Sequence, residues 1–170
     1  MGELADRIDR MRVRASTPDG GITAELRDRD QLSLTFREGL YPLLDDAELG
    51  RRLAVLANLL WVARTREYWR IYGDVTGDYS IGEDPPADAR DLAWRAERDE
   101  LVATGSSAGG HITVRVIGMR RWRVTVRAGT VRALDELQFT RAAGEAAGGL
   151  IREQFAGLAA LSHRHYGDDR

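Results

Sequence analysis

Residues 111–127 read HITVRVIGMRRWRVTVR, and this stretch is the strongest indication of the fold class. Apolar and polar residues alternate in it over two short runs. The apolar members are Ile112, Val114 and Val116 in the first run and Trp122, Val124 and Val126 in the second. An alternation of period two predicts half-buried β-strands. Gly118-Met119-Arg120 lies between the runs, where a hairpin needs a short connection, so the stretch predicts an antiparallel strand pair.

The same pattern occurs ninety residues earlier, with Asp28-Arg29-Asp30 as the connection. The alternating apolar residues there are Ile22, Ala24 and Leu26, then Leu32, Leu34 and Phe36. A shift of ninety positions aligns residues 9–45 with 99–135 without a gap. Ten positions are identical: Asp9/Asp99, Ser16/Ser106, Gly20/Gly110, Ile22/Ile112, Thr23/Thr113, Thr35/Thr125, Arg37/Arg127, Gly39/Gly129, Leu44/Leu134 and Asp45/Asp135. We infer an internal repeat, because glycines align at turns and apolar residues align in strands.

Each copy is predicted to have the order α-β-β-β-α. Short first strands are expected at residues 13–15 and 102–104. A long helix closes each copy and begins at Asp45 or Asp135, each followed three residues later by Glu or Gln. This spacing is that of a capping box, in which the N-cap carboxylate accepts from a free amide of the first turn.

The segment between the copies differs in composition from both. Residues 73–90 hold three glycines, two prolines and five acidic residues against one arginine. Such a stretch has little apolar surface to bury, so we interpret residues 74–90 as a linker between a first repeat, 1–73, and a second, 91–170. An active-site loop is the alternative.

The second long helix is rich in small residues. They are Gly144, Ala146, Ala147, Gly148 and Gly149. Glycine in a helix costs about 0.5–1 kcal/mol relative to alanine, so its retention indicates close approach by another backbone. Compositional drift in a GC-rich genome is the competing explanation.

Composition excludes several classes of function. The 170 residues include no cysteine, which excludes thiol catalysis, Cys-ligated metals and disulfides. All 25 basic residues are arginine, and the net charge is −2. The sequence has no stretch of about 18 apolar residues and no basic-then-apolar start, so we expect no membrane span, no signal peptide and a cytoplasmic protein.

Residues 104–118, TGSSAGGHITVRVIG, followed by RWRVTV at 121–126, resemble the central three-stranded segment of the YbaB/EbfC family of nucleoid-associated proteins. Residues 15–36 are similar to the divergent actinobacterial branch of that family. The resemblance implies an α+β homodimer fold of two α-β-β-β-α protomers, which a tandem chain would supply as an intramolecular pseudo-dimer with antiparallel sheets and long helices. It implies sequence-tolerant DNA binding, or a protein partner in relatives associated with type VII secretion.

Charge differs between the two copies. Residues 111–132 carry six arginines and no acid, whereas residues 21–42 carry three arginines and four acids. The six candidate DNA-binding residues are Arg115, Arg120, Arg121, Arg123, Arg127 and Arg132. Arginines on one strand face can contact several phosphates without reading sequence. A solvated outer face is the alternative, because arginine is the default basic residue of this chain.

Aromatic residues gather on the first long helix and are the candidate partner-binding group: Trp61, Tyr68, Trp69 and Tyr72. All but Trp69 share one helix face by their spacing. They fit ordinary core packing, or an exposed interface for a protein partner.

We expect no enzyme, cofactor or metal site. His163 and His165 are two apart and point in different directions on a helix, and His111 has no carboxylate nearby in sequence. No phosphate loop or catalytic motif occurs. The sequence thus predicts a non-catalytic binding protein, nucleoid-located if it binds DNA. The alternative is an adaptor or chaperone-like module for a protein partner. The chain would be a monomeric pseudo-dimer or a higher homo-oligomer.

Overall fold

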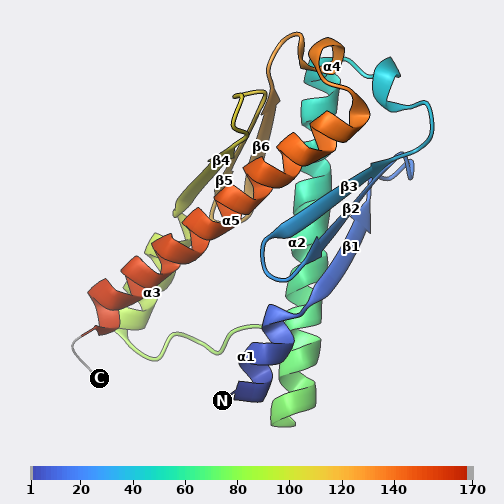
Figure 1. Cartoon of the computed structure of the whole chain (residues 1–170). Coiled ribbons are helices and arrows are strands. Elements are labelled where there is room, and N and C mark those ends of the chain that lie inside the picture. The colour runs from blue at the N-terminus through green and yellow to red at the C-terminus, as the bar shows by residue number, and fades with distance from the viewer. Residues whose placement is uncertain (1, 168–170) are drawn as a thin grey trace.

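The computed structural model describes residues 2–167, which fold into helices and two small antiparallel sheets (Figure 1). The first half contains α1 (Gly2–Asp9), β1 (Arg12–Ser16), β2 (Ile22–Arg27), β3 (Gln31–Phe36), the 3₁₀ turn η1 (Tyr41–Leu43) and α2 (Asp46–Thr76). The second contains α3 (Ala89–Asp99), β4 (Val102–Ser106), β5 (Ile112–Ile117), β6 (Arg121–Val126), α4 (Thr130–Ala133) and α5 (Glu136–Tyr166). The expected α+β class is confirmed, and all three strands and the long helix recur at an offset of ninety residues.

Each sheet is a meander in which the middle strand pairs with both neighbours. The predicted period-two pattern is confirmed, since Ile22, Ala24 and Leu26 are buried on one face of β2 and the residues between them face outward. The β2–β3 and β5–β6 connections use the left-handed backbone region, at Asp28 and Arg29 in one and Gly118 and Met119 in the other. Local alternation and turn chemistry therefore set both sheets.

The two long helices begin where the capping pattern predicts. The Asp45 carboxylate accepts from the backbone N–H of Glu48, and Asp135 makes a full capping box with Gln138. α2 ends at Thr76 and is capped by Gly77, whose φ of +77° suits a residue without a side chain. It thus continues three residues beyond residue 73, and only 77–88 lie outside helices between the halves.

Each long helix contacts strands of both sheets. α2 packs on β1 of its own sheet and on β6 of the other, and α5 packs on β4 and on β3 in the same manner. In Figure 1 the two helices converge at the top of the view and diverge toward the bottom. The outer edges of β3 and β6 are therefore covered by a helix from the other half of the chain, which protects them from pairing with another molecule.

The small residues of α5 allow it to approach two strands closely, as the sequence predicted. A Cβ placed on Gly144 would lie 3.2 Å from the carbonyl oxygen of Leu32 in β3. On the other side, a Cβ placed on Gly105 of β4 would lie only 1.9 Å from the carbonyl oxygen of Ala146. Helix and strand backbones are in contact here, so the glycines have a packing reason.

Buried residues of both halves form one apolar core. A cavity of about 90 Å³ lies within it, bordered by apolar side chains of both sheets and both long helices, including Trp61 and Trp122. Within residues 2–167, no helix combines the length and the apolar character needed to cross a membrane.

Candidate nucleic-acid interface on the second sheet

Four of the six candidate arginines lie together on the solvent side of the second sheet. Arg115 on β5 and Arg121 and Arg123 on β6 are exposed, and their neighbours Val116, Val124 and Trp122 turn toward the core. Arg127 continues the β6 row one residue past the strand. We call Arg115, Arg121, Arg123 and Arg127 the arginine face.

The centre of this face holds two like charges opposite each other. Arg115 and Arg123 are direct partners in the β5–β6 register, with Thr104 of β4 on the other side of Arg115. Like charges directly opposite across strands destabilise a sheet by a few tenths of a kcal/mol. The outward positions of β4, β5 and β6 contain no acidic residue: they are Val102, Thr104, Ser106, Thr113, Arg115, Ile117, Arg121, Arg123 and Thr125.

The ends of the arginine face are partly engaged by the protein itself. Arg121 forms an ion pair of 2.9 Å with Glu100. Arg127 donates to the carbonyl oxygen of Gly109 at 2.9 Å. Within the described part of the chain, Arg115 and Arg123 have neither an ion pair nor a side-chain hydrogen bond, so the centre of the face is available to an external anion.

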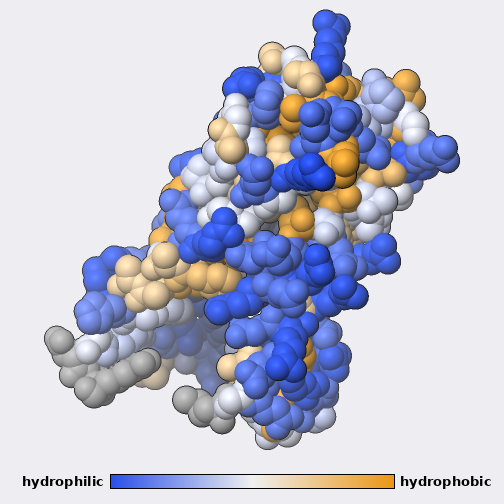
Figure 2. Space-filling model, viewed as in Figure 1, coloured by the Kyte–Doolittle hydropathy of each residue, from blue (hydrophilic) through white to orange (hydrophobic). Residues whose placement is uncertain are grey.

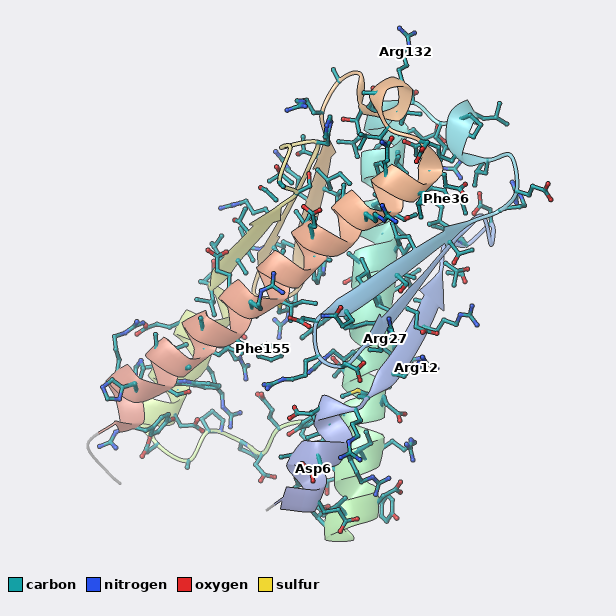
Figure 3. All side chains as sticks on the ribbon, in the orientation of Figure 1. Asp6, Arg12, Arg27, Phe36, Arg132 and Phe155 are labelled. Atoms are coloured by element: carbon teal, nitrogen blue, oxygen red, sulfur yellow. The ribbon has the colours of Figure 1, made fainter. Side chains whose placement is uncertain are left out.

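The other two candidates lie off this face. Arg120 belongs to the β5–β6 turn and approaches Asp99 at 3.9 Å. Arg132 lies on α4, and Figure 3 shows its side chain extending away from the body at one tip of the molecule. The six arginines that are grouped in sequence therefore form a cluster of four and two separate charges.

The first sheet carries arginines that the sequence analysis missed. Arg12 and Arg27 are direct partners across β1 and β2, and Arg14 lies opposite Glu25 (Figure 3 labels Arg12 and Arg27). Arg12 also forms an ion pair of 3.3 Å with Glu25. β1 precedes residues 21–42, the stretch in which the charges of the first copy were compared. Its polar-apolar alternation at 12–16 was the signal that could have found Arg12 and Arg14.

The aromatic group of α2 is half-buried throughout. Trp61 and Tyr68 pack against the core, whereas the rings of Tyr68, Trp69 and Tyr72 contact one another at centroid distances of 5.2–6.5 Å. A separate apolar stripe lies on the exposed surface of α2, which sequence reasoning did not identify: Val55, Leu59 and Val62 are 48%, 37% and 41% exposed. Their spacing of four and three places them on one helix face.

The histidines lie apart from the arginine face or at its end. His111 contacts Thr130 at 3.4 Å, and His165 lies 3.1 Å from a Glu97 carboxylate oxygen. Across residues 2–167, no three His, Asp or Glu side chains gather in a way that could hold a metal ion. Comparison of the chain with protein-family models, with curated proteins and with solved structures finds no match.

Proposed function

We propose that this protein binds duplex DNA with little sequence preference, through the arginine face of its second sheet. The observation that carries the proposal is the directly opposed pair Arg115 and Arg123, which is exposed, forms no ion pair within the described residues and has no acidic residue at the outward strand positions around it. A phosphate between two guanidinium groups would remove the repulsion that the free protein bears. Threonine and serine hydroxyls beside them supply further donors to phosphate oxygens.

The fold supports the same proposal through its repeat. We infer an intramolecular pseudo-dimer of the YbaB/EbfC kind, because strand bounds recur at ninety residues and each long helix packs on both sheets. The two halves would then have diverged in charge. The second sheet keeps an outer face without acids, and the first carries Glu25 among its arginines.

The test is a salt titration of binding to two unrelated 30-bp duplexes, followed by fluorescence anisotropy. Four phosphate contacts predict a slope of log K against log salt of about −3.6, equal for both sequences. In the double variant Arg115→Glu with Arg123→Glu, we expect affinity at low salt to fall by at least about tenfold. The slope should fall to about half of the wild-type slope, because two of the four phosphate contacts are lost. The charge-matched control is Arg10→Glu with Arg66→Glu, because both residues are exposed and neither belongs to a strand.

Binding that is undetectable at low salt, or equal in the arginine-face variant and the wild type, would overturn the DNA proposal. Equal losses in both double variants would also overturn it, because attraction would then depend on net charge and not on this face.

A second candidate function is protein binding, favoured by the exposed stripe of Val55, Leu59 and Val62. Apolar residues on one helix face form a typical docking surface for another helix. A second copy of the chain is the simplest partner to test. If the stripe joins two copies, sedimentation equilibrium should show a dimer for the wild type and a monomer for Leu59→Arg. If it does not, both proteins should sediment as monomers.

A further inference from the structure

A second, larger concavity lies where α2 and α5 diverge. It has a volume of about 900 Å³ and is bordered by α2, α3, α5, the β5–β6 turn and the loop at Gly82 and Glu83. Figure 2 shows the molecule hollowed between the C-terminal part of α5 and the opposite α1–α2 side. Its walls include three of the four tryptophans of the chain: Trp61, Trp69 and Trp94. We call it the helix groove.

Arg64, one of the residues that line the groove, has no carboxylate partner in the described part of the chain. Arg64 is half-buried, and its guanidinium lies 4.8 Å from the ring centroid of Trp61 and 5.9 Å from that of Phe155. Within residues 2–167 it has no ion pair and no hydrogen bond. Burial, together with the nearby positive charge of Arg29, lowers the pKa of Arg64. The two aromatic rings offset part of the cost of this burial, but the guanidinium has no anionic partner among residues 2–167, so an anion from outside would stabilise it further.

Two further polar groups on the groove residues lack partners. Gln154 is 4% exposed and its Oε1 accepts no hydrogen bond, and the Nε1–H of Trp94 donates none. Buried polar atoms are nearly always paired, so each such atom calls for an explanation. Gln154 and Trp94 line the same groove from α5 and α3 respectively.

Other charges around the groove are already occupied or lie in water. Arg98 meets Glu83 and Asp99, and Arg120 approaches Asp99 at 3.9 Å. Arg66 lines the groove but is exposed, where water already solvates it. Arg64 is therefore the guanidinium that would gain most from a ligand.

We propose that the helix groove binds a small organic anion with an aromatic body. Its acid group meets the Arg64 guanidinium, and its ring lies among the tryptophans that line the groove. Carboxylate, sulfonate and phosphate each carry two oxygens on one atom, and such a pair can accept two parallel N–H bonds from a guanidinium. The groove has a volume of about 900 Å³, and tryptophan rings as well as polar and charged side chains border it. This volume lies in the size range of small-molecule sites. This site is separate from the arginine face and does not depend on DNA binding.

The experiment compares two fluorescent probes of the same skeleton. 8-Anilinonaphthalene-1-sulfonate carries the acid group, and N-phenyl-1-naphthylamine lacks it. We expect the sulfonate to bind the wild type at least about tenfold more tightly, because a charge-assisted contact of this kind changes affinity by that order. In Arg64→Met, which keeps an apolar stem, this preference should disappear. Arg64→Lys, which keeps the charge, should retain most of it, and Arg51→Met outside the groove should match the wild type.

Thermal melting of each variant separates binding from folding. Arg64→Met should melt near or above the wild-type temperature, because it removes a half-buried charge that has no anionic partner in the described chain and keeps an apolar side chain beside the rings. Equal affinity for the two probes in the wild type, or an unchanged sulfonate affinity in Arg64→Met, overturns the proposal. Sulfonate affinities that follow melting temperature, with Arg64→Lys and Arg64→Met weakened alike, overturn it as well.

Discussion

Gly105→Ala tests how closely α5 approaches the second sheet. The ninety-residue repeat alone predicts a harmless change, because Ala15 occupies the equivalent position of β1. The structure predicts the opposite. The added Cβ would lie 1.9 Å from the carbonyl oxygen of Ala146 and 2.5 Å from the backbone nitrogen of Leu150, and real Cβ atoms essentially never come within 3.0 Å of a neighbour.

The cost follows from the displacement that this contact requires. Moving the carbonyl oxygen of Ala146 from 1.9 to 3.0 Å away from the new Cβ separates α5 from β4 by about 1.1 Å. This oxygen and the nitrogen of Leu150 are both backbone atoms, so the contact cannot be relieved by rotating a side chain. A gap of about 0.5–1 Å already loses a quarter to a half of the dispersion attraction around it. Overpacking of this kind costs about 1–3 kcal/mol, and the loosened packing of the helix adds to this cost. We therefore expect the free energy of unfolding to fall by about 2–4 kcal/mol. For a chain of this length that corresponds to a fall in Tm of roughly 5–10 °C.

Chemical unfolding followed by circular dichroism measures this loss. Gly149→Ala is the matched control, because its Cβ would lie 3.7 Å from the Cα of Gly105, an ordinary contact, and alanine favours the helix by up to about 1 kcal/mol. The two substitutions face each other across one contact and should change stability in opposite directions. A Gly105→Ala protein within about 0.5 kcal/mol of the wild type would refute the close approach of α5.

Two further predictions concern carboxylates. Asp46→Ala should lower the free energy of unfolding in urea by about 1–2 kcal/mol. The Asp46 carboxylate accepts from two backbone N–H groups at the start of α4, both at 2.9 Å. The control Glu136→Ala, at the equivalent position ninety residues later, should change stability little. The backbone N–H of Gly21 lowers the pKa of Asp19 to about 2 from its ordinary 3.8, so its contribution to stability is complete above about pH 4 and is lost as pH falls toward 2. Urea unfolding of wild type and Asp19→Asn between pH 2 and 6 should show a constant difference above pH 4 that closes toward pH 2, and a difference that persists at pH 2 would contradict this assignment.

The sequence predicted what depends on near neighbours along the chain. Alternation of period two located the strands, and the spacing of Asp135 and Gln138 located the start of α5. It also predicted that Gly144 and its neighbours meet another backbone, but not that this backbone is β3 from the other half.

The candidate site was predicted less completely, for the same physical reason. Arg115 and Arg123 could be placed on one face by parity, whereas the separation of Arg132 depends on the direction that the chain takes after β6. Arg64 was not identified from the sequence, although it lies three residues after Trp61 on α2. One of the two rings beside its guanidinium, that of Trp61, is a near neighbour on α2, whereas the other, that of Phe155, comes from α5, ninety-one residues away.

The exchange of helix contacts between the halves has a consequence for assembly. Because α2 covers β6 and α5 covers β3, neither half can complete its own hydrophobic core, and the loop at 77–88 keeps the two at a high effective concentration. A chain nicked in this loop would remain folded as a noncovalent pair whose melting temperature depends on dilution. A chain whose loop is too short to span the two halves would fold by exchanging them with a second molecule, as in domain swapping. The loop thus decides between one chain and two without touching the core.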